Sequence, residues 1–362
     1  MKKNVRYDWA DFMRGIMMCM VVLYHSEVYY YNTHTWSWVF EPVFLSGFFF
    51  VSGFLFTKQI ESVSWKSKCR QVLRGIVLPY FFFVLLLAIP KIWIGHVSLR
   101  QSLIDIVMMR ASWFVVTIGV LQLLYAGILR YTSSIRMISF CTLGMFLIGY
   151  GFVVMYRNCP VWILQNPWLH SVELPNRLPL CINLALVQSP FFLLGILFRR
   201  YEDHPWVCNL IGGGYKRMII YLILYIGLYL WIDYNYIGSR MCVVVDSYTN
   251  ILLIYGYALL GIFALTNLSK IVQLWKPMNY IGQYSIVFYF LNGAALTLVS
   301  ALAKSIPQVS PESYINQIIV AIIATLLIFP CVWFINRYLP ILTGNKDSFN
   351  RISSKLGLKI KW

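Results

Sequence analysis

The chain has 362 residues, of which 59% are hydrophobic and 12% are charged, and its formal net charge is +17. A soluble domain carries about 25% charged residues, so this composition excludes an ordinary soluble protein and is typical of a polytopic membrane protein. The positive charge does not indicate nucleic-acid binding, because the chain has no soluble basic domain. The eight cysteines form no C-x-x-C pair and no Cys/His cluster, so no metal site is predicted.

Ten apolar segments are each near the length that crosses about 30 Å of hydrocarbon. In chain order they are residues 9–31, 39–58, 72–94, 112–130, 137–156, 181–199, 216–232, 248–267, 278–303 and 315–338. The sequence therefore predicts an all-α, polytopic membrane protein with about ten transmembrane helices. A single membrane domain covers residues 1–344, and a short basic tail covers residues 345–362.

The orientation follows from the basic residues, which collect in the loops that stay in the cytoplasm. With the N-terminus inside, 22 of the 30 basic residues fall in inner segments and seven in outer segments, and Arg14 lies within a span. The seven outer residues are Lys91, Arg100, Arg110, Arg157, Arg177, Arg240 and Lys304. This asymmetry predicts that both termini are cytoplasmic.

The first span carries polar residues that a lipid-facing helix would not retain. Arg14 and His25 are eleven residues apart, which on a helix is three turns plus about 20°, so both lie on one face about 16 Å apart. Asp11 precedes Arg14 by three residues and can pair with it. This face is predicted to point into the helix bundle or a cavity.

A structural interpretation of these residues stays open. His25 could hydrogen-bond a neighbouring helix, and Arg14 could extend to the cytoplasmic interface. The other four histidines fall in loops: His34, His96 and His170 in outer segments and His204 in an inner one.

Further motifs occur in a fixed order along the chain. They are D-x-x-R-G at residues 11–15, the histidine at residue 25, F-F-F-V-S-G-F at residues 48–54, basic residues before Pro79-Tyr80, and YIGQYSIVFYFLN at residues 280–292. Together they resemble the acyltransferase-3 family of integral membrane O-acyltransferases. The ten-span layout with both ends inside fits the same family.

This resemblance implies a reaction. An acyl group, usually acetyl, passes from cytoplasmic acetyl-CoA or another acyl-CoA to a sugar hydroxyl in a cell-surface or exported glycan or its lipid-linked precursor. The acyl-CoA is a co-substrate, and no bound cofactor is implied. The expected location is the bacterial inner membrane, and the expected partners are the lipid bilayer, acyl-CoA and the carbohydrate acceptor. The oligomeric state is not implied.

The resemblance assigns the family's conserved arginine and histidine to Arg14 and His25, and with Asp11 these are the predicted catalytic residues. His25 would take the proton from the acceptor hydroxyl as a general base, or would carry the acyl group briefly. Arg14 is too far from His25 for a hydrogen bond. It would anchor the donor, whose extended pantetheine arm has a comparable length.

Lys68, Arg70 and Arg74, which follow the second span, are predicted to bind the donor. Arg70 and Arg74 lie four residues apart and share a face of a helix, and guanidinium groups suit the three phosphate groups of coenzyme A. The alternative is that these residues only mark the cytoplasmic side. Some family members have a tighter R-x-x-R here, whereas this chain has R-x-x-x-R.

Three residues are candidates for the acceptor side. Glu41 stands at the outer mouth of the second span, and Trp113 opens the fourth, although an interfacial aromatic belt also explains the tryptophan. Asn292 stands where family members often have the histidine of a Leu-His pair, and its amide cannot accept a proton at neutral pH.

A second function remains open at this point. A polysaccharide exporter or flippase without acyl-transfer chemistry would need a polar path, which Asn183, Gln188, Asn250 and Asn292 could line. Such a path has little need of a single titratable base aligned with a cytoplasmic cation, so Arg14 and His25 favour the enzyme.

Overall fold

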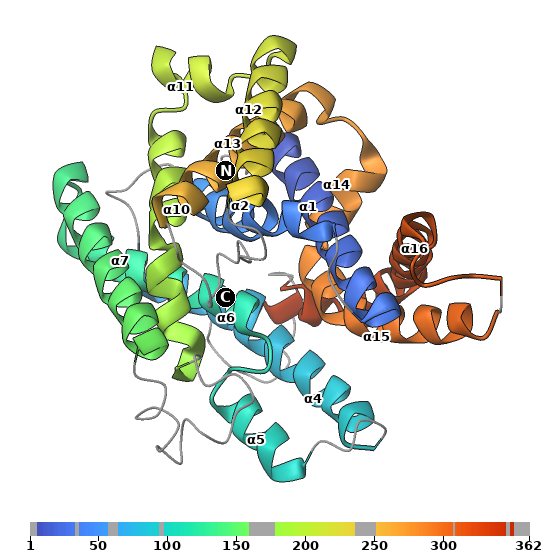
Figure 1. The fold of residues 1–362 in the computed structure, drawn as a ribbon. Helices are drawn as coiled ribbons and strands as arrows, with labels where there is room; N and C mark the ends of the chain where they lie inside the picture. The colour runs from blue at the N-terminus through green and yellow to red at the C-terminus, as the bar shows by residue number, and fades with distance from the viewer. Residues whose placement is uncertain are drawn as a thin grey trace. The chain divides into compact units, whose positions relative to one another are not determined.

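The structure is a computed structural model, and it describes residues 6–32, 36–56, 64–93, 98–158, 178–235, 251–306, 308–344 and 348–350. Within these ranges every regular element is a helix (Figure 1), which confirms the all-α prediction. The α-helices are α1 (Asp8–Ser26), α2 (Glu41–Phe54), α3 (Trp65–Val72), α4 (Leu78–Trp93), α5 (Leu99–Val107), α6 (Trp113–Tyr131), α7 (Ile135–Asn158), α10 (Ile182–Arg200), α11 (Pro205–Ile211), α12 (Tyr215–Asn235), α13 (Ile251–Val272), α14 (Lys276–Gln283), α15 (Ser285–Lys304) and α16 (Tyr314–Tyr338).

Short turns of other helix types join some of these helices. The π-helical turns are η1 (Glu27–Tyr31) and η4 (Leu73–Val77), and the 3-10 turns are η2 (Ser37–Phe40), η5 (Pro179–Cys181) and η6 (Pro340–Thr343). The η4 turn lies just before Pro79 in a helical run that continues from α3 into α4. Because proline lacks an N–H and its ring collides with the carbonyl four residues earlier, a widened turn at this place accommodates it.

Nine helical segments of the described residues are long and apolar enough to cross a membrane. They are Ser37–Phe54, Trp65–Pro90, Trp113–Tyr131, Ile135–Val154, Pro179–Arg200, Tyr215–Ile232, Leu253–Val272, Ser285–Lys304 and Tyr314–Tyr338. These segments coincide with the second to tenth predicted spans. The first predicted span coincides with α1 and η1; it is helical, but its polar residues make it less apolar than the nine.

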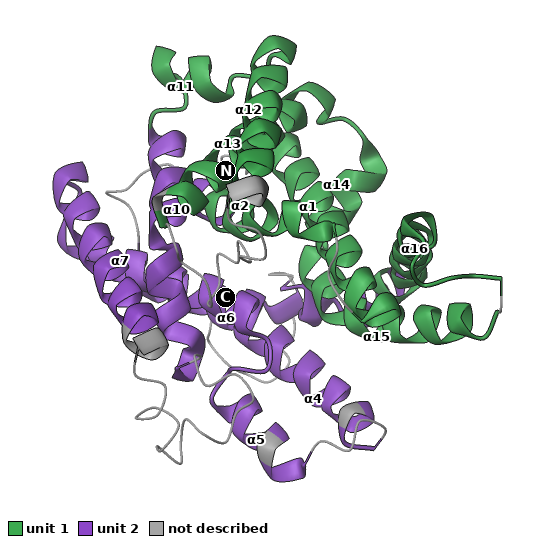
Figure 2. Ribbon diagram, viewed as in Figure 1, with its two compact units in different colours: residues 1–51, 201–332 green, residues 52–200, 333–362 purple. Residues whose placement is uncertain are grey.

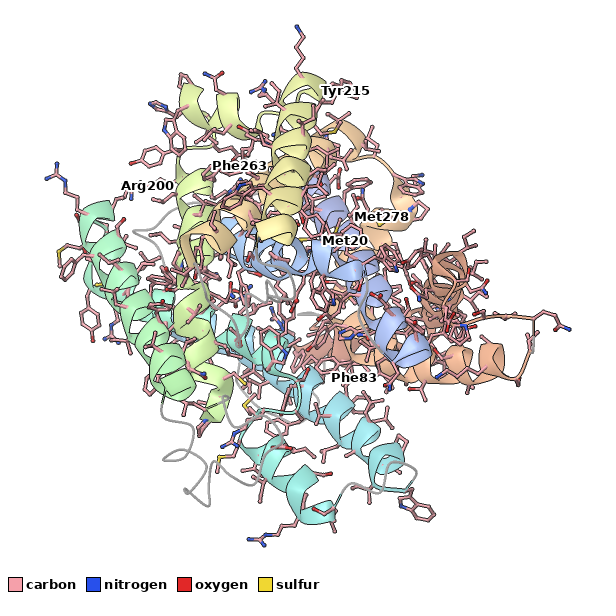
Figure 3. The ribbon with its side chains drawn as sticks, viewed as in Figure 1. Met20, Phe83, Arg200, Tyr215, Phe263 and Met278 are labelled. Carbon is pink, nitrogen blue, oxygen red and sulfur yellow. The ribbon has the colours of Figure 1, made fainter. Side chains whose placement is uncertain are left out.

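The surface of several helices is apolar in a way that fits lipid and not water. The side chains drawn in Figure 3 include those of α12, which begins at the labelled Tyr215. Isoleucine and leucine side chains at residues 219, 220, 222, 223, 224 and 226 of this helix are exposed. Soluble proteins rarely expose a contiguous apolar surface of this kind, so the chain is a polytopic membrane protein.

The chain divides into two compact units (Figure 2). The first comprises residues 1–51 and 201–332, and in it α1 packs against α13, α14 and α15, while α12 and α11 pack against α13. The second comprises residues 52–200 and 333–362, and in it α6 and α10 pack together, α7 packs along α10, and α3 packs along α6. Figure 1 labels these helices except α3.

Candidate active site

The helix α1 carries all three predicted catalytic residues, Asp11, Arg14 and His25, on one unbroken backbone. It is α-helical from Asp8 to Ser26, so the spacing of Arg14 and His25 corresponds to about 16 Å along a single axis. Most of its apolar side chains are buried, among them Phe12, Met17 and Val21. This burial fixes the helix in the first unit, and with it the relative positions of the two polar groups.

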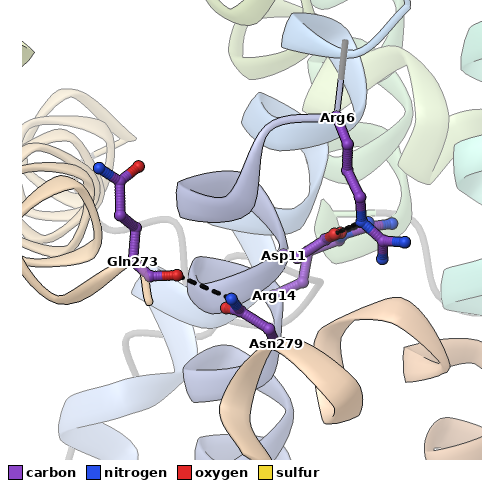
Figure 4. Close-up of polar contacts among 5 residues, drawn as sticks. All are labelled: Arg6, Asp11, Arg14, Gln273 and Asn279. Atoms are coloured by element: carbon purple, nitrogen blue, oxygen red, sulfur yellow. Dashed lines mark hydrogen bonds and ion pairs between the residues drawn. The ribbon is translucent and has the colours of Figure 1, made fainter. Parts of the chain in front are cut away.

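Asp11 is the centre of an ionic cluster at the beginning of α1 (Figure 4). The residue is 3% exposed, and its carboxylate accepts a hydrogen bond from Arg6 Nε at 2.6 Å and another from Arg14 Nη2. The predicted pairing of Asp11 with Arg14 is therefore present, and Arg6 is a partner that the sequence argument missed. Two cations on one buried carboxylate give this three-residue cluster a net positive charge, and Asp8 places an exposed carboxylate at the same end of the helix.

Two glycines let the backbone of α14 approach this cluster. A Cβ atom at Gly15 would overlap the carbonyl oxygen of Met278, which is labelled in Figure 3, and a Cβ atom at Gly282 would overlap the carbonyl oxygen of Asp11. Gly15 belongs to the D-x-x-R-G motif and Gly282 to the YIGQ motif. The two motifs therefore meet at one helix crossing, which explains why each contains a glycine.

The α1–α14 crossing also buries polar atoms that have no hydrogen-bond partner among the described residues. These atoms are Arg14 Nε and Asn279 Oδ1, and Asn279 is held in place because its Nδ2 donates to the Gln273 carbonyl at 2.7 Å. Figure 4 draws Asn279 with Arg14 and Asp11. A buried unsatisfied donor costs about 1–3 kcal/mol, so Arg14 is well suited to binding an external acceptor.

His25 lies in the last turn of α1 and is half-buried among aromatic rings. Its ring centroid is 5.4 Å from that of Tyr24 and 6.5 Å from that of Tyr29, both in edge-on orientation. The apolar body of these rings limits the hydration of the imidazole. Tyr24 also contacts Phe44 of α2, with ring centroids 5.6 Å apart.

Asn292 lies on the helix that packs beside His25's end of α1. It is 6% exposed, and its Nδ2 donates to the carbonyl of Tyr289 in its own helix, α15. The next residue, Gly293, faces the hydroxyl of Tyr29, and Lys304 of the same helix donates to the Tyr29 carbonyl at 3.2 Å. Asn292 thus belongs to the helix that holds Tyr29 in place beside the imidazole.

Glu27 is a functional candidate that the sequence argument missed. It is fully buried in the π-helical turn η1, and its carboxylate accepts hydrogen bonds from Trp36 N at 3.2 Å, Ser37 N at 3.1 Å and the Ser37 hydroxyl. An acidic residue two positions after His25 was the available signal. Its carboxylate joins the end of α1 to the turn that begins α2.

Glu41, the first residue of α2, is 9% exposed. An acidic side chain in the first turn of a helix is stabilised by the helix dipole, so this glutamate has a structural role besides any contact with an acceptor. The preceding turn is fixed by Tyr257, whose hydroxyl donates to the Val39 carbonyl at 2.9 Å.

The predicted donor-binding residues Lys68, Arg70 and Arg74 belong to the second unit. Lys68 Nζ donates to the Phe56 carbonyl and lies 4.0 Å from the centre of the Phe56 ring, so this ammonium group already has a partner in the protein. Arg70 lies in the last turn of α3, and Arg74 lies in the π-helical turn η4, where the wider turn alters the spacing expected for a regular α-helix. Arg70 is exposed and Arg74 is half-buried.

Trp113 is the first residue of α6 in the second unit, is half-buried, and packs edge-on against Phe114 at 5.7 Å. Of the residues suggested for a transport path, Asn183 and Gln188 are buried in α10. His34, His96, His170 and Asn250 lie outside the described residues, as does most of the tail from residue 345.

A family model described as an acyltransferase domain, that of the acyltransferase-3 family, matches residues 7–337. The chain belongs to the acyltransferase-3 family. The match includes α1, the α1–α14 crossing and α15, so the predicted site residues lie within the acyltransferase domain, whereas Arg6 immediately precedes the matched range. No curated protein and no solved structure matches the chain. The protein is therefore a membrane acyltransferase.

Proposed function

We propose that this acyltransferase moves an acyl group, most simply acetyl, from cytoplasmic acyl-CoA to a hydroxyl of a cell-surface or exported glycan or its lipid-linked precursor. The observation that carries the proposal is the arrangement on α1, where Arg14 is held by Asp11 and His25 lies about 16 Å further along the same helix. That separation is comparable to the length of an extended pantetheine arm.

Arg14 binds the acyl-CoA donor in the proposed reaction. Its guanidinium belongs to a cluster with net positive charge, and its Nε is a buried donor without a partner among the described residues. A phosphate of coenzyme A supplies the acceptor oxygens that such a group lacks. The exposed Arg70 and half-buried Arg74 are further donor-binding candidates, whereas Lys68 is engaged by Phe56.

His25 is the proposed catalytic residue for the acyl-transfer step. As a general base, its imidazole takes the proton of the acceptor hydroxyl while the hydroxyl oxygen attacks the thioester carbonyl carbon. The new C–O bond forms, the C–S bond breaks, and the coenzyme A thiolate leaves and receives the proton from the imidazolium. Alternatively an imidazole nitrogen attacks the thioester first, the C–S bond breaks, and coenzyme A leaves as the thiol with the imidazole proton. The acceptor hydroxyl then attacks the acyl-imidazole, the N–C bond breaks, and the hydroxyl proton returns to the imidazole. Glu41, Trp113 and Asn292 are the proposed acceptor-side residues.

The direct test compares cells that carry the gene with cells that lack it. Alkali-labile acyl groups on cell-envelope and exported glycans, measured by mass spectrometry and NMR, should be present only with the gene. Glycans that keep their acyl groups but no longer reach the surface without the gene would contradict the proposal and support the exporter.

A further inference from the structure

Arg110 is a buried cation that the proposed reaction does not use. It lies in the second unit between α5 and α6, in a segment that the charge pattern assigns to the outer side, and it is 3% exposed. Its backbone N–H donates to the Asp105 carbonyl at 2.8 Å. Among the described residues no carboxylate forms an ion pair with its guanidinium, and its Nε is buried without a hydrogen-bond partner.

A buried guanidinium without a counter-charge is destabilising. The effective penalty for burying one ion is several kcal/mol, and it is recovered only when an opposite charge and hydrogen bonds satisfy the group. Because no carboxylate among the described residues pairs with Arg110, we expect a ligand to supply its counter-charge.

The beginning of α6, two residues further along the chain, also attracts an anion. Arg110 precedes the N-cap residue of α6, Ser112, by two positions, and the Ser112 side chain makes no capping hydrogen bond. The first N–H groups of a helix have no partner within the helix and carry a partial positive charge. A 19-residue helix with an uncapped amino end and a buried arginine beside it has the features of an oxyanion site.

The backbone around Arg110 is held on both sides, which preorganises the site. The hydroxyl of Tyr80 in α4 donates to the carbonyls of Asp105 and Ile106, each at 3.3 Å. The N–H of Leu180 donates to the Met108 carbonyl at 2.9 Å, and Met109 has a φ of +53°. These contacts fix the segment that carries Arg110 without using its guanidinium.

We propose that Arg110 and the amino end of α6 bind an oxyanion, a carboxylate or phosphate carried by the acceptor. Binding of the anion is argued from the burial of Arg110, from its unpartnered Nε, and from the absence of an ion pair to its guanidinium among the described residues. The assignment of the anion to the acceptor rests on the proposed function. It predicts an acidic acceptor, such as a glycan with uronic acid or phosphate groups or a phosphate-linked lipid precursor.

The test measures thermal unfolding of the purified full chain in a maltoside detergent, which contains no phosphate. The probes are inorganic phosphate, glucuronate and phosphatidylglycerol, with sodium chloride at equal ionic strength as the reference. The variants are Arg110→Gln and, as a matched control, Arg100→Gln, which removes an exposed arginine of α5. Without anion, Arg110→Gln should unfold at a temperature no lower than the wild type, because the substitution removes an unpaired buried charge.

An anion should raise the unfolding temperature of the wild type and of Arg100→Gln but not of Arg110→Gln, whose affinity should fall roughly 10- to 100-fold. Stabilisation by phosphate or glucuronate identifies a soluble acidic group, and stabilisation by phosphatidylglycerol alone identifies a lipid phosphate. Equal responses of wild type and Arg110→Gln, or no response of the wild type to any probe, would overturn the proposed anion site.

If Arg110→Gln does not fold, Arg110→Lys takes its place. It should respond to the anion more weakly than the wild type, because lysine lacks the guanidinium fork. A response of Arg110→Lys equal to that of the wild type would overturn the proposed anion site.

The same variants separate this inference from the proposed function. Glycan acylation in cells should fall with Arg110→Gln and stay normal with Arg100→Gln. A wild type that binds the anion but acylates no glycan would refute the proposed function and leave the anion site standing.

Discussion

The guanidinium of Arg14 owes its orientation to Asp11. The carboxylate is buried and accepts from both Arg6 and Arg14, so removing its charge leaves two arginines without their anion. In the proposed reaction Asp11 is a positioning residue, because it acts on the donor through Arg14 and does not touch the reacting atoms.

Substituting Asp11→Asn should therefore weaken the use of the donor more than it slows the chemical step. A charge-assisted hydrogen bond contributes about 1.5–3 kcal/mol, so we expect the KM for acyl-CoA to rise roughly 10- to 100-fold with a smaller change in kcat. The control is Asp8→Asn, which removes an exposed carboxylate from the same helical turn. Equal effects of the two substitutions on KM would show that Asp11 does not position Arg14.

Some single residues could be predicted from the sequence and others could not. The spacing of Asp11, Arg14 and His25 within one helix is local, so helical geometry was sufficient to place them on α1. Glu27 was missed because its partners, Trp36 and Ser37, lie beyond the end of the helix and are brought to it only by the turn between α1 and α2.

At the scale of helices, the crossing of α1 and α14 holds the ionic cluster in place. Gly15 and Gly282 bring two backbones together from positions more than 260 residues apart in the chain. No periodicity within either helix encodes that partnership. The sequence therefore revealed both glycine-containing motifs but not the contact between them.

Substituting Gly282→Ala should damage both stability and activity. The new Cβ atom would overlap the Asp11 carbonyl oxygen, and forced overpacking of this kind costs about 1–3 kcal/mol. The matched control is Gly227→Ala in α12, where nothing lies within 4 Å of the added Cβ atom and alanine favours the helix. The unfolding temperature and the rate of acyl transfer should both fall for Gly282→Ala and not for Gly227→Ala. An unfolding temperature of Gly282→Ala that matches that of Gly227→Ala would contradict the close crossing.

The helical run of α3 and η4 carries the remaining donor-binding candidates. Replacing both Arg70 and Arg74 with glutamine should weaken acyl-CoA binding to purified protein more than acceptor binding, because each arginine can supply a charge-assisted contact to phosphate. Lys66→Gln, in the exposed part of α3, is the control. An unchanged donor affinity would mean that the two arginines only mark the cytoplasmic side.

At the scale of the whole molecule, hydropathy predicted the helices well. Nine of the ten predicted spans coincide with long apolar helices, because each needs only a local run of apolar residues. The division into two units was not predicted, because it depends on which helices pack together, and apolar runs do not encode partners. The positions of the site residues are therefore described separately within each unit.

The orientation of the chain is a separate prediction from the distribution of basic residues. Reporter fusions after Lys68 and after Lys361 should be cytoplasmic, and a fusion after Asn176 should be external; the last two positions lie outside the described residues. A cytoplasmic signal from the reporter fused after Asn176 would contradict the ten-span topology.

The central claim is that His25 performs the acyl transfer. The most direct measurement is glycan acylation in cells that express His25→Ala at a level matched to the wild type, with membrane insertion checked in the same cells. We expect acylation to fall at least about 10²- to 10⁴-fold, the usual contribution of a general base, while His204→Ala, which alters an exposed loop histidine, keeps normal acylation. Near-normal acylation with His25→Ala would contradict the account.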